Sequence, residues 1–231
     1  MSIKTDIIDT LRSAPCSGLS FRLLHVHIRS AQYHRLSLEI EHGRVQIVQS
    51  PTALPAGVAA YYRDHSTIMV GPGASVSQNL IVHEATHAIC DIQHRSMNFY
   101  DSEMVAYVAQ VMFKFLQGGI PPLSHAQAVP LAQQSSLLCI SSPAAPTCRN
   151  AIGDAAGVIA LSVMRGQHVS HRDIDRLRTI LRTHPRYRAG GFGPRASAAQ
   201  HHRGIGLKLD GLGDKFLTRE QLSQLNATVL H

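Results

Sequence analysis

The sequence lacks both a membrane-spanning run and the pattern of a secretory leader. No uninterrupted apolar run reaches the roughly 18 residues that indicate a transmembrane helix. Residues 1–18 lack the continuous apolar core of a signal peptide. We therefore expect no membrane span and synthesis in the cytosol, with export by a signal-independent secretion system left open.

Cysteine pairs with metal-binding spacing are also absent. None of the four cysteines forms a C-x-x-C pair, so a cysteine-based zinc site is not expected. Cys139 and Cys148 flank a stretch rich in Ser, Pro and Ala. They would form a disulfide in an oxidising compartment or remain free thiols in the cytosol, and both alternatives stay open.

Long charged blocks and single-residue repeats are missing as well. With 44% apolar residues among 231, the composition is that of a folded globular protein. We expect one domain over residues 1–231, with a core over 20–190 and a Gly-rich segment and short helix within 190–231.

The formal net charge of +7 favours anionic partners in general. The basic residues are spread along the chain, and the densest run of arginines, in 171–188, follows a helical pattern. No recognised nucleic-acid motif accompanies this charge, so we interpret the run as a solvated helix face and do not expect nucleic acid as the partner.

The first third of the chain has the pattern of a small sheet. Residues 21–28 read as one strand, and residues 35–40 and 45–49 alternate apolar and polar side chains around a turn at 41–44. A further short strand is expected over 67–70.

Helical patterns follow. Ser75 or Ser77 can cap a helix that runs to about Asp91, and Asp101 or Ser102 can cap a second one that ends at Gly118. Further helices are expected over 126–138, 149–165, 170–183 and from 218, with a Gly-rich loop or lid over 189–206. A sheet followed by helices predicts an α+β fold with a mainly helical C-terminal half.

The most informative string is His83-Glu84-Ala85-Thr86-His87, an HExxH pattern in an apolar helix. Histidines at i and i+4 project from one helix face, so both imidazoles can bind one Zn²⁺ at about 2.0 to 2.1 Å. Glu84 need not be a ligand, because it can hydrogen-bond a zinc-bound water and take its proton as a general base. An apolar helix burying this trio without a partner would lose several kcal/mol, which a metal would offset.

A catalytic zinc needs a third protein ligand and an open position. Glu103 lies 16 positions after His87, just inside the second helix, and the loop between the helices is long enough for them to pack antiparallel. We therefore predict His83, His87 and Glu103 as the ligands of one Zn²⁺ per chain. Asp91 and Asp101 are the alternative carboxylates, and Asp91 is better placed to orient His87.

These residues resemble the gluzincin group of zinc metallopeptidases. That group pairs an HExxH helix with a glutamate on a following helix, often in a Glu-x-x-Ala-Tyr context, which residues 103–107 match. The resemblance covers about residues 60–117 and implies a zincin-like fold and hydrolysis of peptide or amide bonds. It also implies an edge strand beside the HExxH helix that binds extended substrate, for which residues 66–70 are the candidate.

Hydrolysis also needs a donor to the oxyanion of the transition state. Tyr107 shares the helix face of Glu103, and Tyr187, His184 and His171 are the rivals.

We thus expect a zinc metallopeptidase acting on a peptide or protein substrate, with the general character of an exported bacterial effector or toxin. The alternatives are an inert zinc-binding regulatory or interaction module and a basic nucleic-acid-binding protein. The presence of Glu84 favours the enzyme, because inert sites usually lose that residue.

Overall fold

The computed structural model describes residues 2–50, 54, 56–72, 77–93, 97–118, 126–130, 132–134, 148–184 and 187. Within them the fold is a mixed α+β arrangement, mostly helical, with two small sheets, which confirms the predicted fold class. No helix within these ranges is long and apolar enough to cross a membrane.

The elements follow one another along the chain. The strands are β1 (Phe21–Leu23), β2 (Val26–Ile28), β3 (Gln46–Gln49), β4 (Ala59–Tyr62) and β5 (Thr67–Val70). The helices are α1 (Ile3–Arg12), α2 (Ala14–Ser17), α3 (Ser30–Glu41), a 3-10 turn (Arg63–His65), α4 (Gln78–Ile92), α5 (Phe99–Gly118), α7 (Cys148–Met164) and α8 (His171–Thr183). Residues 126–130 and 132–134 are also helical.

The prediction of a strand over 35–40 is wrong, because these residues belong to helix α3. Tyr33, Leu36 and Ile40 are fully buried, at the i, i+3 and i+7 spacing of one helix face. Leu38, which a strand would place on the same face as Leu36 and Ile40, is only half-buried. The helical pattern therefore begins at Tyr33, two residues before the alternating run.

The single strand predicted over 21–28 is two strands. β1 and β2 pair antiparallel, with Phe21 opposite Ile28 and Leu23 opposite Val26. Leu24 takes a left-handed conformation (φ 55°) in the tight turn between them. The run is apolar at both ends because both strands bury side chains against the helices.

The second sheet has the strand order β3-β5-β4, with β5 parallel to β3 and antiparallel to β4. Its side chains alternate between two faces: Tyr61 and Ile68 join the main core, whereas Ala60 and Met69 join a small cluster on the opposite face. The predicted strand at 67–70 exists, but it is central in the sheet. The expectation that residues 66–70 form the edge strand is wrong, and β4 holds that position beside α4.

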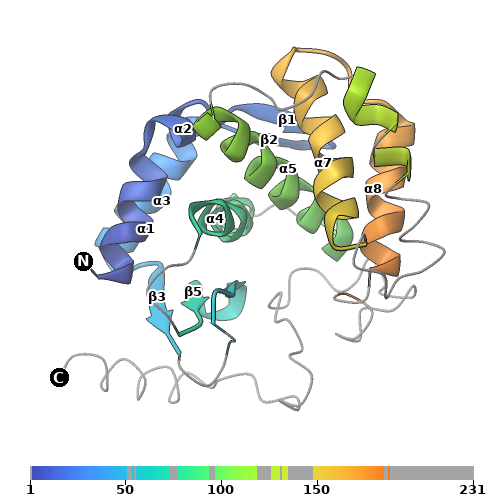
Figure 1. The fold of residues 1–231 in the computed structure, drawn as a ribbon. Helices are drawn as coiled ribbons and strands as arrows, with labels where there is room; N and C mark the ends of the chain where they lie inside the picture. The colour runs from blue at the N-terminus through green and yellow to red at the C-terminus, as the bar shows by residue number, and fades with distance from the viewer. Residues whose placement is uncertain are drawn as a thin grey trace.

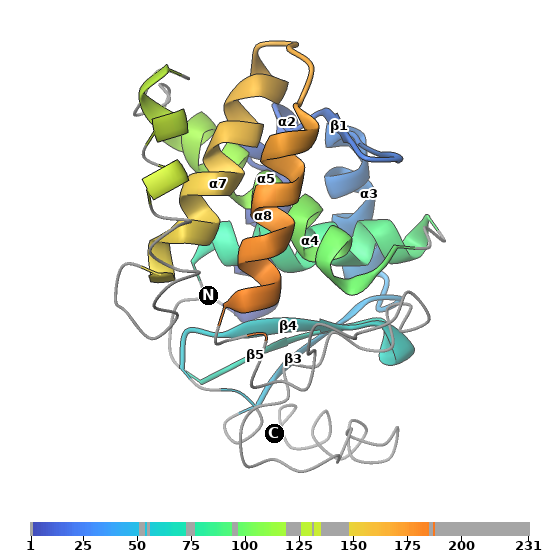
Figure 2. The ribbon, with the colours of Figure 1, turned by 90° about the vertical axis from the view of Figure 1, so that its right-hand side faces the viewer.

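Helix α4 runs through the middle of the molecule. Ser77 caps it by accepting the main-chain N–H of Leu80, as predicted, and ten consecutive residues from Ile81 to Cys90 are buried. It packs against α5, α3, α1 and β4. Figure 1 shows α4 end-on, surrounded by the N-terminal helices, α5 and the strands, and Figure 2 shows the helices standing on the β3-β5-β4 sheet.

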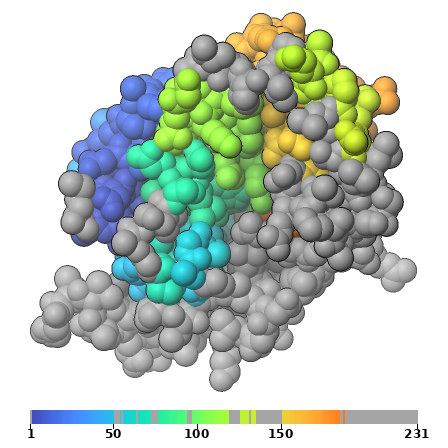
Figure 3. Space-filling view, viewed as in Figure 1, coloured from blue at the N-terminus to red at the C-terminus, as the bar shows by residue number. Residues whose placement is uncertain are grey.

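Helix α5 begins earlier than predicted. Asn98, rather than Asp101 or Ser102, accepts the main-chain N–H of Asp101 at 2.9 Å, and its amide donates to the Asp101 carboxylate. Arg178 of α8 donates to the same carboxylate at 2.8 and 3.1 Å and ties α8 to the start of α5. In Figure 3 the green atoms of α4 and α5 lie above the cyan atoms of the β3-β5-β4 sheet.

Several expectations fall outside the described residues. They are the Gly-rich loop, the C-terminal helix from 218, and any disulfide between Cys139 and Cys148. Helix α8 follows its prediction closely, with Ser170 accepting the N–H of Asp173 as the cap, and α7 begins and ends one residue before the predicted 149–165.

Candidate metal centre

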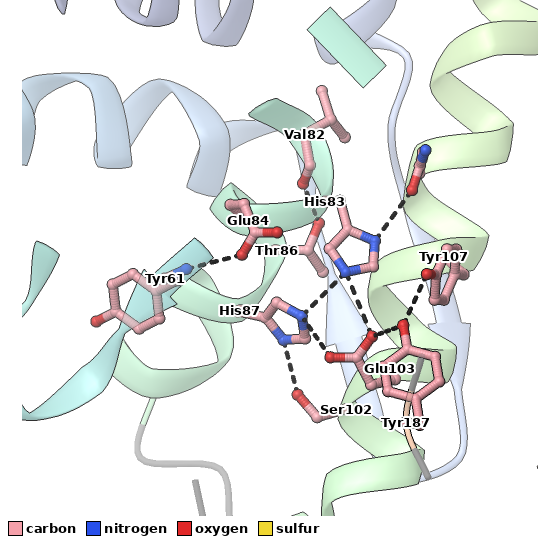
Figure 4. A network of polar contacts seen from close by, with 11 residues as sticks. Tyr61, Val82, His83, Glu84, Thr86, His87, Ser102, Glu103, Tyr107 and Tyr187 are labelled. Carbon is pink, nitrogen blue, oxygen red and sulfur yellow. Dashed lines mark hydrogen bonds and ion pairs between the residues drawn. The ribbon is translucent and has the colours of Figure 1, made fainter. Parts of the chain in front are cut away.

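The HExxH helix and the helix after it bring the three predicted ligands together. His83 and His87 lie one turn apart on α4 and face α5, where Glu103 lies in the first turns of the helix. One ligand atom from each of the three lies within 4.8 Å of the others. All three side chains are buried, with Glu103 3% and His87 1% exposed. This cluster can hold a metal ion, and Figure 4 shows its side chains converging.

The separations within the cluster match those around a tetrahedral ion. The two Nε2 atoms of His83 and His87 are 3.2 Å apart. Glu103 Oε2 lies 3.5 Å from His83 Nε2, and Glu103 Oε1 lies 3.4 Å from His87 Nε2. A tetrahedron has edges about 1.63 times its centre-to-corner distance, so ligands bound at about 2.0 to 2.1 Å lie about 3.3 to 3.4 Å apart.

The other nitrogen of each imidazole is occupied. His83 Nδ1 lies 3.0 Å from the side-chain oxygen of Gln110, and His87 Nδ1 lies 2.8 Å from the hydroxyl of Ser102. An amide oxygen only accepts, so a neutral His83 carries its proton on Nδ1 and keeps a lone pair on Nε2. The Ser102 hydroxyl can accept in the same way from His87.

Three electron-pair donors therefore face one another in a buried space. When both imidazoles are neutral and carry their protons on Nδ1, no proton lies on His83 Nε2 or His87 Nε2 to bridge them to each other or to Glu103. Lone pairs in this arrangement repel, and a cation between them removes the repulsion. The donor set of two imidazoles and one carboxylate fits Zn²⁺.

Glu103 is fully buried yet held as an anion. Burial alone raises the pKa of a carboxyl group, but in the metal-free site hydrogen bonds from the protonated imidazoles of His83 and His87 and their charge outweigh it, so the pKa of Glu103 lies well below its ordinary value. The Tyr187 hydroxyl donates to Glu103 Oε2 at 2.6 Å, and the Tyr107 hydroxyl lies 2.7 Å from that of Tyr187.

Glu84 bonds to the main chain of the sheet through one of its two carboxylate oxygens. Its Oε2 accepts the main-chain N–H of Tyr61, in β4, at 2.8 Å, and the side chain is 5% exposed. Tyr62 follows Tyr61 on β4, and burial and the nearby charge of Glu84 raise its pKa. Figure 4 shows the Glu84 carboxylate directed toward Tyr61 while the imidazoles are directed toward α5.

The four candidate oxyanion donors lie at different distances from the ligands. Tyr107 and Tyr187 lie at the ligands, and the His184 ring lies 6.1 Å from that of Tyr187. His171 is exposed at the opposite end of α8, about 18 Å along the helix from Thr183 at 1.5 Å per residue.

The alternative carboxylates lie elsewhere. Asp91, expected to orient His87, instead accepts from the Tyr61 hydroxyl at 2.7 Å and pairs with Arg63. Its position on α4 turns it toward β4, so the role predicted for it is wrong. Asp101 is paired with Arg178, as described above.

Sequence reasoning missed Ser102 and Gln110. A signal existed for Gln110, because Glu103, Tyr107 and Gln110 follow the i, i+4, i+7 spacing of one face of α5. Ser102 directly precedes Glu103, and its sequence position suggests only a helix cap.

Comparison with protein-family models, with curated proteins and with solved structures found no match for this chain.

Proposed function

We propose that this protein is a zinc-dependent metallopeptidase with a zincin-like fold. The observation that carries the proposal is the convergence of His83 Nε2, His87 Nε2 and the Glu103 carboxylate at separations of 3.2 to 3.5 Å. Separations of this size are close to those between the ligands of a tetrahedral Zn²⁺ ion, and three protein ligands would leave the fourth position for water or substrate.

The residues around the ligands support this role. Gln110 and Ser102 fix the tautomer and orientation of the imidazoles, as second partners do in most histidine–metal sites. When bound, Zn²⁺ would polarise the scissile carbonyl and make water acidic enough to act as nucleophile near neutral pH.

Glu84 is the proposed general base. Because its Oε2 is engaged by the Tyr61 N–H, transfer of the proton falls to Oε1 of the same carboxylate. The main-chain hydrogen bond holds the carboxylate on the β4 side of α4, so the nucleophile would approach from that side. Tyr187, whose hydroxyl touches Glu103, is the nearest of the four candidate oxyanion donors to the ligands.

Strand β4 is the proposed binding edge for substrate. It lies at the margin of the three-stranded sheet and against α4. Its Tyr61 N–H is already bonded to Glu84, so a substrate strand would pair with other main-chain groups of β4. An extended peptide can add to such an edge by main-chain hydrogen bonds. The substrate class is therefore a peptide or an extended protein segment.

The proposal is tested by Glu84→Gln. This change keeps the size of the side chain and its contact with Tyr61 but removes its basicity. A general base contributes about 10² to 10⁴ in rate, so hydrolysis of a broad peptide library should fall by that factor while zinc content stays near one per chain. His83→Ala, which removes a ligand, should lose both.

An unchanged rate in Glu84→Gln would leave the metal with a regulatory or structural role. Full zinc content in a His83→Ala, His87→Ala double variant would refute the site itself.

A further inference from the structure

Two tyrosines from distant parts of the chain meet at the carboxylate of Glu103. Tyr107 lies one turn after Glu103 on α5, and Tyr187 follows α8. Figure 4 shows the Tyr187 hydroxyl between Glu103 and the Tyr107 hydroxyl. The proposed peptidase chemistry assigns Tyr107 no task and needs neither tyrosine to bind the metal.

The direction of these hydrogen bonds follows from counting protons. The carboxylate of Glu103 has no proton to give, so the Tyr187 hydroxyl donates its single proton to Oε2 at 2.6 Å. At the 2.7 Å contact between the two hydroxyls, the Tyr107 hydroxyl must therefore be the donor. The order is Tyr107 to Tyr187 to Glu103.

Both rings are held in place by packing. Tyr187 is 3% exposed, and its ring meets Phe99 edge-on with centroids 5.6 Å apart. Tyr107 meets the His83 ring edge-on at 4.6 Å. The rigid setting means that the hydroxyl of Tyr187 presents one fixed position to Glu103.

That position decides which way the carboxylate faces. Oε2, which accepts from Tyr187, is also the oxygen nearest His83 Nε2, whereas Oε1 is nearest His87. Without a donor at Oε2, the carboxylate group could rotate about its last side-chain bond and leave the imidazoles. Buried carboxylates are held by such donors, because an unsatisfied oxygen is costly.

We propose that Tyr187 is a positioning residue of the metal centre, which fixes the Glu103 carboxylate in its ligating orientation and is itself fixed by Tyr107. This inference rests on the metal site of the proposed function. It makes Tyr187, which follows α8 in sequence, part of a site whose ligands all come from α4 and α5.

The test is the affinity of the full-length protein for Zn²⁺ and Co²⁺, measured by competition with a chelator. Loss of a second partner of a ligand typically costs about 10- to 100-fold in metal affinity, so Tyr187→Phe should show a loss in that range. Tyr107→Phe should show a smaller loss, because it acts through Tyr187.

Tyr33→Phe is the matched control. The Tyr33 hydroxyl is also buried and makes one hydrogen bond of 2.8 Å, to Thr86, but touches no ligand. It should lose thermal stability without metal to a degree similar to Tyr187→Phe, yet keep wild-type metal affinity.

The visible spectrum of the Co²⁺ form reports the geometry of the ligands directly. A changed spectrum in Tyr187→Phe, with a wild-type spectrum in Tyr33→Phe, would support the proposal. Wild-type affinity and spectrum in Tyr187→Phe would overturn it, as would equal losses of affinity in both variants or failure of metal-free Tyr187→Phe to fold. Absence of metal binding by the wild-type protein would instead refute the proposed function.

Discussion

At the scale of single residues, each imidazole of the candidate metal centre is held at its Nδ1 nitrogen. Gln110 and Ser102 take the Nδ1 atoms, and the Nε2 atoms face the ligand space. Ser102 and Glu103 are neighbours in sequence, so the first turns of α5 supply both a ligand and the residue that orients a ligand on the other helix.

We predict that Ser102→Ala lowers Zn²⁺ affinity about 10- to 100-fold, because His87 loses the partner that fixes its ring and tautomer. The measurement is chelator competition, with zinc content after dialysis as a second readout. Asp91→Asn is the control, since that carboxylate accepts from Tyr61 and Arg63 on the β4 side of α4. If Asp91→Asn releases the metal and Ser102→Ala does not, the assigned partner of His87 is wrong.

At the scale of elements, helix α3 shows how an apolar pattern can mislead. Leu36, Leu38 and Ile40 alternate as in a strand, yet the same segment offers Tyr33, Leu36 and Ile40 at helical spacing. Burial on one face against α1 and α4 favours the helix, because a strand here would need a partner in a sheet.

The helical and the strand pattern predict different losses of stability when Leu36 and Leu38 are replaced by alanine. We expect Leu36→Ala, at a fully buried position, to lower the free energy of unfolding by about 2 to 5 kcal/mol. Leu38→Ala, at a half-buried position, should cost about 1 kcal/mol. Urea unfolding monitored by circular dichroism measures both. Equal costs at the two positions would argue for the strand.

The local signals located α4, α8, β3 and β5 correctly, because capping serines and periodic apolar residues act within a few positions of sequence. The order of strands in the sheet was beyond such signals. Placing β5 between β3 and β4 depends on which strands pair across long separations, and alternation alone is the same for an edge and a central strand.

In the candidate site, too, local sequence patterns predicted some features and long-range packing decided others. The spacing of His83, Glu84 and His87 and the Glu-x-x-Ala-Tyr context were enough to name the cluster that the structure brings together. The contact of Tyr187 with Glu103 joins residues 84 positions apart and depends on how α8 packs on α5. Tyr187 was therefore only one of several candidates by sequence.

At the scale of the whole molecule, the metal centre lies between the two helices that contribute most to the core. A bound ion would tie α4 to α5; α4 also contacts α1 and α3, and α5 also contacts α2, α7 and α8. Binding to the native state alone therefore raises the stability of the entire fold.

We predict that Zn²⁺ at 100 times its dissociation constant stabilises the protein by about 2.7 kcal/mol. For a chain of this size, that corresponds to a rise in Tm of about 5 to 10 °C, measurable by calorimetry and reversed by a chelator. His83→Ala should show no such rise. A rise that persists in this variant would point to binding elsewhere on the molecule.

The hydrogen bond from Tyr61 to Glu84 is donated by the polypeptide backbone, so it does not depend on which side chain stands at position 61. Every amino acid except proline supplies the same N–H at position 61. For this hydrogen bond alone, related chains can carry different residues at position 61 and keep the contact with Glu84. A scan of side-chain substitutions would therefore not detect the contact. Only a change to the main chain itself, such as an ester in place of that amide, would reveal how much this hydrogen bond contributes to the position of Glu84.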